Sequence, residues 1–312
     1  MRFRLLHVLS ITFGVILCIL SFAVIYQEVK DFRVHDLFAG LAEIAPLSLL
    51  AAVNCVVADY VVLTGYDSIA LAQAGVHLPY RKIALASFLG HAFTINIDLL
   101  TGSSIRYRIY RMFGLTVLQV ATVVFVANAT YLCGFLVLSG LLFTFDPPAA
   151  LAEVHLPFSS LEVLGLVSLS LIFLYIFLSF TWRRLLKIGR WELHIPTPKR
   201  AVAQLLLSSL DWLLSATALY LLLPSIPGLP FTTYLGAFLL AQFLGQLSQA
   251  PAGLGIFEAV MIVLLTPVAS PSLLLGPLLV FRVVYYLLPF FVAAVLLGLT
   301  ELHSRRRAAL AL

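Results

Sequence analysis

The chain has 312 residues, of which 62% are hydrophobic and only 11% are charged, and its mean hydropathy is +1.07. No soluble domain has enough polar surface to cover so much apolar sequence, so a soluble protein is excluded. The apolar runs are continuous and do not alternate with a period of two, which excludes an outer-membrane barrel. The net charge of +5 does not indicate a nucleic-acid partner, because the basic residues gather beside apolar runs.

These features predict an all-α fold, a polytopic bundle of transmembrane helices with broken or re-entrant elements. Helices are expected, in chain order, over about residues 6–26, 38–65, 114–143, 161–182, 201–223 and 276–300. The first is expected to be a retained membrane helix and not a cleaved signal peptide, because its apolar run is long and no small-residue cleavage site follows.

The basic residues set the expected orientation. Most Lys and Arg fall in four clusters: Arg2 and Arg4; Arg81, Lys82, Arg106, Arg108 and Arg111; Arg183, Arg184, Lys187, Arg190, Lys199 and Arg200; and Arg305 to Arg307. The positive-inside rule predicts that all four clusters and both termini lie in the cytoplasm.

Two stretches are too short or too interrupted for ordinary spans. Residues 83–100 are relatively polar and lie between basic clusters, so they are expected to enter and leave the membrane from the cytoplasmic face. The donor-rich segment 102–111 is expected to open the next helix. Residues 232–249 and 256–268 are separated by a Pro-Ala-Gly-Leu-Gly break, and they form either one re-entrant hairpin or two crossings.

A short internal match suggests duplication. The segment Ala86–His91 resembles Ala241–Gln246, and a glycine-containing break follows each. One would enter from the cytoplasm and the other from outside, as in inverted-topology repeats, although apolar segments also match by chance. We expect one domain over residues 1–312, with possible repeat halves at about 1–155 and 156–312.

The break at Pro251 carries the clearest signal for a site. Gly253 and Gly255 allow a tight turn, and Glu258 lies in the first turn of the following helix, where the macrodipole favours a carboxylate. Glu258 is a candidate helix cap, cation site or proton site. Arg282 could reach the outer interface, pair with Glu258 or hold a phosphate, and Tyr285 is an interface anchor or a headgroup contact.

Other charged residues leave further alternatives. Arg106 and Arg108 either bind anionic lipid at the membrane surface or turn inward onto a lipid phosphate. Asp59 and Asp211 lie deep in apolar runs, where a paired or functional role is expected. Asp67, near the predicted end of its helix, is expected to be solvated.

The sequence contains no phosphate-binding G-x-x-x-x-G-K-[ST] loop, no H-E-x-x-H pair and no G-x-S-x-G nucleophile motif. We therefore expect no ATP hydrolysis, no metal site, no cofactor and no enzymatic activity.

Four ordered segments resemble one known family: Gly65–Leu71, Thr101–Tyr110, Pro251–Ala259 and Tyr285–Pro289. They are similar to the transmembrane flippase domain of lysylphosphatidylglycerol synthases, the multiple peptide resistance factors, and to stand-alone membrane proteins of the UPF0104 type. The resemblance covers almost the whole chain. Ala252 departs from it, standing where a second glycine is common.

The resemblance implies a bacterial inner-membrane protein that moves aminoacylated phosphatidylglycerol, such as the lysyl or alanyl form, between leaflets. Because the chain stops at Leu312, the soluble synthase domain of bifunctional members is expected to be absent. The family's charged positions carry over as Asp67, Arg106, Arg108 and Glu258. A separate synthase and a second copy of the chain are possible partners.

The resulting hypothesis is a headgroup site in a polar cavity. Arg106, Arg108 and Arg282 would hold the phosphate, Glu258, Asp67 and Asp211 would face the ammonium group, and Gly253, Gly255 and Tyr285 would complete the site. Two alternatives stay open: a secondary transporter of a small solute, coupled to protons through Glu258 or Asp211, and a non-transporting membrane partner of a separate lipid synthase.

Overall fold

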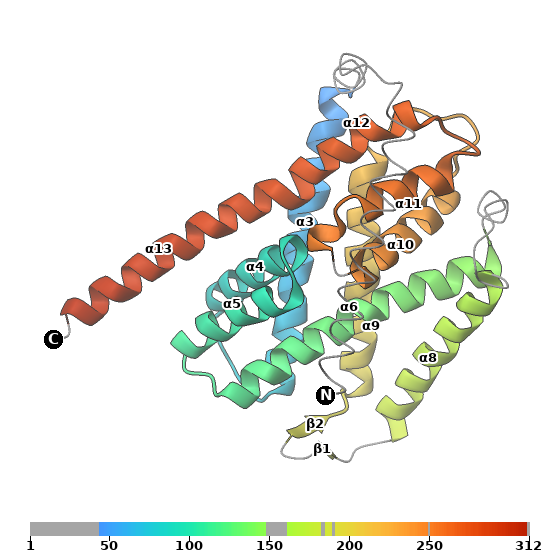
Figure 1. Cartoon of the computed structure of the whole chain (residues 1–312). Helices are drawn as coiled ribbons and strands as arrows, with labels where there is room; N and C mark the ends of the chain where they lie inside the picture. The colour runs from blue at the N-terminus through green and yellow to red at the C-terminus, as the bar shows by residue number, and fades with distance from the viewer. Residues whose placement is uncertain (1–43, 148–160, 182–184, 189–190, 249, 311–312) are drawn as a thin grey trace, which may run out of the picture.

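The computed structural model describes residues 44–147, 161–181, 185–188, 191–248 and 250–310, so the helix expected at about 6–26 lies outside the described residues (Figure 1). The elements are α3 (Pro46–Gln73), α4 (Tyr80–Asn96), α5 (Leu99–Met112), α6 (Val117–Phe145), α8 (Leu161–Thr181), β1 (Leu185–Ile188), β2 (Trp191–His194), α9 (Pro198–Tyr220), α10 (Phe231–Leu247), the 3-10 turn η1 (Pro251–Gly253), α11 (Ile256–Leu265), α12 (Pro271–Phe281), the π-helix η2 (Arg282–Leu287) and α13 (Leu288–Leu310).

Within these residues, five helical stretches are long and apolar enough to cross a membrane: α3, α6, α8, α9 and the continuous stretch Pro271–Thr300. At 1.5 Å per residue the 28 residues of α3 extend about 42 Å, more than the roughly 30 Å of hydrocarbon. Large apolar side chains such as Phe173 and Phe291 are exposed on these helices, as lipid-facing residues are. The predicted polytopic helical bundle is confirmed.

Two helical hairpins lie between the long helices. The arms of α4–α5 pack on each other, as do those of α10–α11. Helix α11 has only 10 residues, about 15 Å, and therefore cannot span the bilayer. The segments 83–100 and 232–268 thus belong to hairpins of the length expected for re-entrant elements.

The donor-rich segment 102–111 does not open the long helix that follows it, as was expected. It belongs to α5, the second arm of the first hairpin. The chain turns at Gly114, whose φ is +92°, and α6 then starts afresh with a capping box between Thr116 and Gln119. The turn and the new cap separate the two helices.

Two further expectations need correction. Helix α3 runs on to Gln73, past the predicted end near residue 65, because Gly65 keeps a helical conformation and the chain first turns at Gly75, whose φ is +69°. Asp67 is therefore inside the helix and fully buried, not solvated.

The basic connection 183–200 contains an antiparallel hairpin in which Leu185 pairs with His194 and Ile188 with Trp191.

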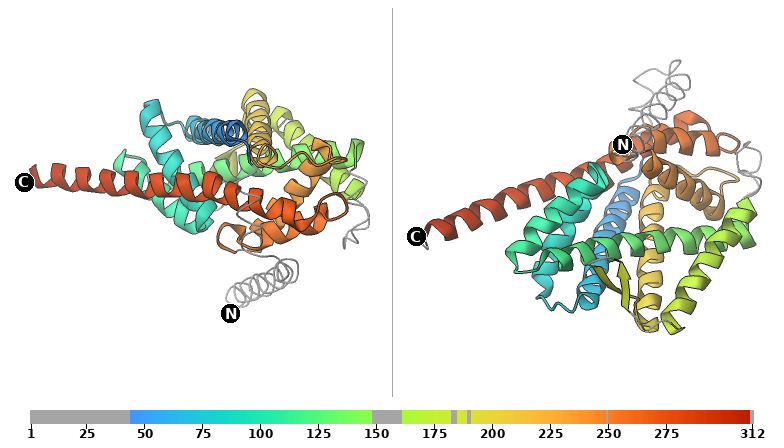
Figure 2. Two further views of the ribbon diagram at one scale, coloured as in Figure 1. Left: turned by 90° about the horizontal axis from the view of Figure 1, so that it is seen from above. Right: turned by 60° about the horizontal axis from the view of Figure 1, so that its bottom comes forward.

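The long helices α3 and α9 run antiparallel and side by side through the centre of the molecule, and α6 crosses both (Figure 1). The hairpin α4–α5 lies on one side of this centre and α10–α11 on the other. Helix α13 contacts α4 and then extends beyond the body to the C-terminus, as Figure 2 shows from two further directions.

The order of elements repeats. A long helix, a hairpin and a long helix occur as α3, α4–α5 and α6, and again as α9, α10–α11 and α12–α13. The matching segments Ala86–His91 and Ala241–Gln246 both lie in the first arm of a hairpin. This order fits the predicted inverted repeat, while the duplication itself and the boundary near residue 155 stay predictions.

Close helix contact should make Gly134 sensitive to substitution. A Cβ at this position of α6 would lie 2.4 Å from the Ser208 carbonyl oxygen of α9. We expect Gly134→Ala to lower the free energy of unfolding by about 1–3 kcal/mol, the usual effect of overpacking, measured by thermal unfolding in detergent. Gly298→Ala is the matched control, because a Cβ there meets nothing within 4 Å. Equal stability of the two variants would contradict this packing.

Candidate functional site

The loop between α10 and α11 reverses the chain within a few residues. Ala252, Gly253 and Gly255 have φ values of 56°, 60° and 79°. Glycine adopts this left-handed region without strain, whereas a residue with a Cβ does not. Gly253 lets the returning chain approach α10 closely, because a Cβ on Gly253 would stand 3.2 Å from the Cα of Gly245. Small residues thus permit the turn, and Ala252 strains it.

Glu258 and Arg282 hold this loop together. One Glu258 oxygen accepts a hydrogen bond from the Gly255 amide at 2.9 Å, and the other accepts one from Arg282 Nε. Arg282 also donates from Nη1 to the Ala252 carbonyl at 2.5 Å and from Nη2 to the Gly253 carbonyl at 3.3 Å. We call the Glu258–Arg282 pair, with its bonds to the loop backbone, the loop clamp. Two of the alternatives raised by the sequence, a helix cap and an ion pair, therefore occur together.

Aromatic rings enclose the clamp. The Arg282 guanidinium lies 4.4 Å from the Tyr286 ring centroid and 5.7 Å from that of Phe257, which are cation–π distances. Arg282 begins the π-helix η2. Pro289, one turn further, has no N–H to bond to the Tyr285 carbonyl, which favours a local departure from α-helix. Such π-helical segments are frequent at functional sites.

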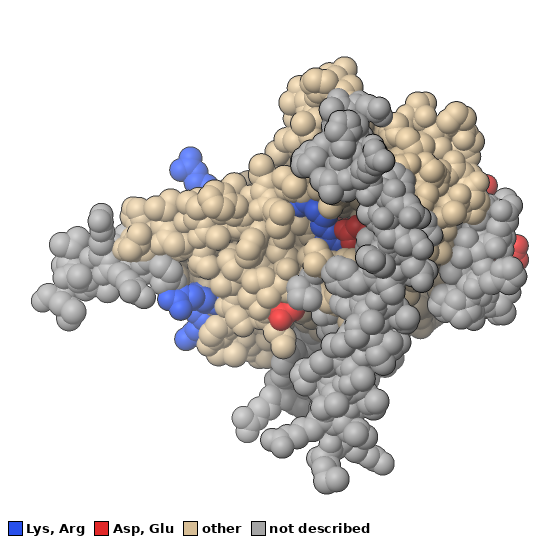
Figure 3. Space-filling model, turned by 45° about the horizontal axis from the view of Figure 1, so that its top comes forward, with Lys and Arg blue, Asp and Glu red and all other residues tan. Residues whose placement is uncertain are grey.

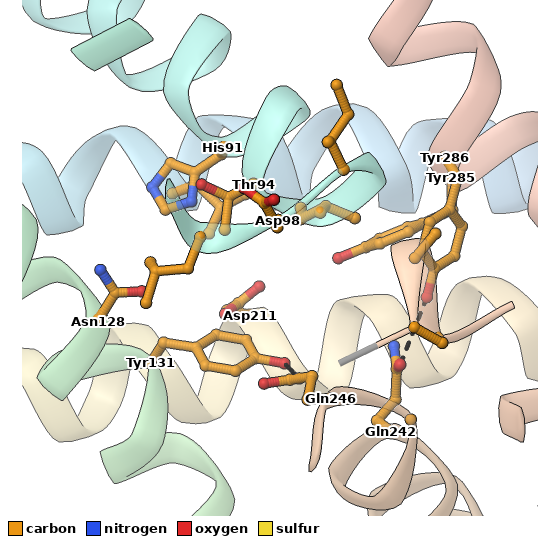
Figure 4. Close-up of a pocket in the computed structure, with 18 of the residues that line it drawn as sticks. His91, Thr94, Asp98, Asn128, Tyr131, Asp211, Gln242, Gln246, Tyr285 and Tyr286 are labelled. Carbon is orange, nitrogen blue, oxygen red and sulfur yellow. Dashed lines mark hydrogen bonds between the residues drawn. The ribbon is translucent and has the colours of Figure 1, made fainter. Parts of the chain in front are cut away.

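A cavity of about 280 Å³ lies beside the loop, between the tips of the two hairpins (Figure 4). Helices α3, α4, α6, α9 and α10, the loop and η2 all contribute to its wall. Its polar lining consists of His91, Thr94, Asp98, Asn128, Tyr131, Asp211, Gln242, Gln246, Tyr285 and Tyr286.

The lining carries acids and amides but no Lys or Arg among the described residues. Asp211 projects into the cavity from α9 (Figure 4). The other acid, Asp98, caps the N-terminus of α5 by accepting a hydrogen bond from the Thr101 amide at 2.5 Å. A described lining with two carboxyl groups and no Lys or Arg favours a cationic guest over an anionic one.

Hydrogen bonds tie both hairpin tips to the neighbouring helices. Gln246 of α10 donates to the Tyr131 hydroxyl of α6 at 2.5 Å, and Asn96 of α4 donates to the Tyr286 carbonyl of η2 at 3.1 Å. The Tyr286 hydroxyl donates to Gln242 at 3.3 Å. Movement of either tip would therefore break specific polar contacts and change the cavity.

A second buried ion pair fastens the first hairpin to α3. Arg106 Nη2 lies 3.3 Å from Asp67 Oδ1, and the Tyr110 hydroxyl donates to Asp67 Oδ2 at 2.6 Å. His91 Nε2 lies 3.6 Å from Asp67 Oδ1, so this imidazole stands between the pair and the cavity that it lines. A Cβ at Gly90 would lie 2.3 Å from Arg106 Cγ, so glycine makes room for the arginine.

The nine site residues predicted from the sequence separate into three groups: the cavity lining (Asp211, Gly253, Tyr285), the loop clamp and its turn (Gly255, Glu258, Arg282), and α5 with its partner (Asp67, Arg106, Arg108). The first two groups adjoin. The third lies apart from the cavity lining, with Arg106 buried and Arg108 exposed. The headgroup roles of all nine stay predictions.

The predicted site contained only Asp211 and Tyr285 of the ten polar lining residues; the eight that it missed include His91, Asn128, Gln242 and Gln246. Each of these four is a polar residue in a mainly apolar helical segment, which is the signal that could have found them. A search of the sequence for charged residues alone does not find these residues.

Comparison with known proteins agrees with this architecture. Residues 8–293 match the family described as lysylphosphatidylglycerol synthase TM region. The chain belongs to this family. The resemblance inferred from the four sequence segments is thereby confirmed.

Relatives fall into two size classes. The chain is 35% identical over 300 residues to the protein slr0712 of Synechocystis sp., covering 94% of this chain and 92% of the relative. It is 28% identical over 293 residues to the inner membrane protein YbhN of Escherichia coli, covering 93% and 91%. It is 26% identical over 299 residues to a phosphatidylglycerol lysyltransferase of Staphylococcus haemolyticus, covering 94% of this chain but 34% of that protein. The chain therefore spans about a third of the lysyltransferase.

The loop clamp predicts strong coupling between its two side chains. We expect Arg282→Leu to destabilise the protein by about 3–5 kcal/mol, because Glu258 stays buried without its cation. Glu258→Gln should be milder, and the double variant should be more stable than the sum of the single effects predicts, by about 0.5–3 kcal/mol. Denaturant unfolding of all four proteins in detergent measures this cycle. Additive effects would show that the pair is not coupled.

The strain at Ala252 predicts a stabilising substitution. Ala252→Gly removes the Cβ from a left-handed residue and should raise the free energy of unfolding by about 1 kcal/mol. The matched control is Gly253→Ala, which adds a Cβ at φ +60° and should lower stability. A destabilised Ala252→Gly protein in the same thermal unfolding assay would contradict the predicted strain.

Proposed function

We propose that the protein moves a phospholipid between the leaflets of the bacterial inner membrane, with the headgroup passing through the cavity and the acyl chains staying in lipid. The observation that carries this proposal is the cavity itself. It lies where the tips of two hairpins meet, in a bundle whose outer surface is apolar. The face shown in Figure 3 bears few charged side chains among its described atoms, as a lipid-facing surface requires.

The lining favours a cationic headgroup. Asp211 faces the cavity, and the described lining holds no Lys or Arg, so an ammonium group would find a carboxylate there. The amides of Asn128, Gln242 and Gln246 can donate to ester and phosphate oxygens. Aminoacylated phosphatidylglycerol, such as its lysyl or alanyl form, combines these groups. The relatives named phosphatidylglycerol lysyltransferase support this choice of lipid.

The arginines are proposed to act at different stages. Arg282 bonds to Glu258 and to the loop carbonyls, so a headgroup phosphate would have to compete with the loop clamp for it. Arg108 is exposed on α5 and would meet lipid phosphate at the membrane surface. Arg106 is buried against Asp67 and would serve by holding the first hairpin in place.

The proposed orientation follows from the basic clusters. With both termini in the cytoplasm, α4–α5 enters from the cytoplasmic side and α10–α11 from the opposite side. The two tips would then separate the cavity from the two membrane faces, which suits alternating access. A synthase that makes the lipid would act on the cytoplasmic leaflet as a separate partner.

A leaflet-resolved assay tests the proposal. Proteoliposomes containing lysylphosphatidylglycerol are treated with a membrane-impermeant amine reagent, and the labelled fraction is followed over time. We expect Asp211→Asn to slow the appearance of inner-leaflet lipid about ten- to a hundredfold, because a hydrogen bond to a charged group contributes about 1.5–3 kcal/mol.

Asp146→Asn, an exposed position at the end of α6, is the matched control and should transport normally. If wild-type protein gives the same labelled fraction as protein-free vesicles, the proposed function is wrong. Transport that is equal in Asp211→Asn and the wild type would sink the assignment of the cavity.

A further inference from the structure

Two carboxyl groups meet in the centre of the bundle. Asp59 lies near the middle of α3, and Asp211 lies near the middle of the antiparallel α9. Their side chains are within hydrogen-bonding reach of each other, and 0% and 2% of the two residues are exposed. Asp211 reaches the cavity, whereas Asp59 lies behind it and is not part of the lining.

Tyrosine hydroxyls bond the outer oxygens of this pair. Tyr66 donates to Asp211 Oδ2 at 2.6 Å, and Tyr285 donates to Asp59 Oδ2 at 2.8 Å. Within the described part of the chain, Asp59 Oδ1 is buried without a hydrogen-bond partner, and so is the hydroxyl of the adjacent Tyr60. A buried polar atom without a partner is energetically expensive, so these orphans indicate that a hydrogen or a cation belongs in the group.

Among the residues that the structure describes, no basic side chain neutralises the pair. The titratable groups that face it are Cys55, Tyr60 and Tyr66 from α3, Tyr131 from α6, and Tyr285 from η2. The nearest imidazole, His91 of α4, stacks edge-on against the Tyr66 ring and turns its Nε2 toward Asp67. The two buried arginines of the described residues are engaged elsewhere, Arg106 with Asp67 and Arg282 with Glu258.

Two carboxylates this close cannot both be ionised in a low-dielectric interior, so the pair must hold one positive charge. A proton shared between the two carboxyl groups is the smallest such charge, and it would give a partner to an oxygen that otherwise has none. In the described structure Asp211 lines the cavity and Asp59 does not, so a larger cation in the cavity would meet the pair at Asp211.

We propose that Asp59 and Asp211 form a one-proton site that releases its proton when a cationic headgroup enters the cavity and binds Asp211. The part of this inference that concerns the headgroup rests on the proposed function. The proton leaves to water in the cavity as the ammonium group arrives, and it returns when the headgroup departs, so the charge of the site stays constant. A site that holds either a proton or a headgroup makes lipid movement an exchange in which the two travel in opposite directions.

Such an exchange limits the difference in lipid concentration between leaflets that a pH difference can sustain. With one proton exchanged per lipid, a difference of one pH unit across the membrane supplies about 1.4 kcal/mol and sustains about a tenfold difference in lysylphosphatidylglycerol between leaflets. Without coupling, the lipid would approach equal concentrations in both leaflets whatever the pH difference.

The proton site can be tested without transport. Purified protein in nanodiscs of phosphatidylglycerol alone is titrated while its infrared spectrum is recorded. We expect a protonated-carboxyl C=O band that both Asp59→Asn and Asp211→Asn remove and that the control Asp146→Asn retains. Absence of the band in the wild type, or its persistence in both variants, would overturn the proton site. Because the nanodiscs contain no aminoacylated lipid, this result does not depend on the proposed function.

Coupling is tested in proteoliposomes with and without a pH difference. The wild type should accumulate lysylphosphatidylglycerol about tenfold in the leaflet facing the acidic side. Asp59→Asn leaves the cavity lining intact and supplies a permanent amide hydrogen to Asp211, so it should equilibrate the lipid between leaflets and lose the accumulation. Its unfolding temperature in detergent checks that it folds.

Accumulation that is unchanged in Asp59→Asn, or that follows a sodium gradient in place of the pH gradient, would overturn the inference while leaving lipid movement intact. Loss of all lipid movement in the wild type, with the infrared band present, would overturn the proposed function and the coupling but leave the proton site standing. The two assays therefore separate the two failures.

Discussion

The architecture depends on the need to satisfy backbone polar groups where helices end inside a membrane. Hydrocarbon offers no hydrogen bonds, so each interrupted helix must find its partners within the protein. The second arm of each hairpin begins at a carboxylate, Asp98 for α5 and Glu258 for α11. Arg282 then satisfies the carbonyls of the turn itself. Each turn thus has a carboxylate that accepts a backbone amide, and in the second turn Arg282 also pairs two carbonyls.

The same need for partners inside the protein explains where the buried charged side chains lie. The buried arginines Arg106 and Arg282 are used in ion pairs that hold the hairpins, with Asp67 and Glu258 respectively. The described cavity lining is left with Asp98, Asp211, the imidazole of His91 and neutral polar groups. The electrostatic character of the cavity is therefore a consequence of how the hairpins are fastened. A wall of this kind accommodates an ammonium group more readily than an isolated phosphate.

The position of the Asp59–Asp211 pair links the helical scaffold to the proposed lipid transport. The central antiparallel helices α3 and α9 bring Asp59 and Asp211 together. From η2, the Tyr285 hydroxyl donates a hydrogen bond to Asp59. The hairpin tips contact η2 and α6 through Asn96 and Gln246. A tip that moves to admit a headgroup would disturb the surroundings of the acids. Such contacts are the physical means by which occupancy of the cavity and protonation of the pair could be coupled.

The sequence by itself determined the membrane class, most of the spans, the broken helix at Pro251 and the place of Glu258 within it. These follow from hydropathy and glycine positions, which are local properties. Only the tertiary structure decided that α5 is a separate arm and that Asp67 and Arg106 form a buried pair away from the cavity. It also decided which lone polar residues face the cavity. The partners Tyr66 and Asp211 are 145 positions apart, and Tyr285 and Asp59 are 226 apart. Contacts across such distances are set by how helices pack, and an apolar run with a single polar residue does not reveal which neighbour that residue will meet.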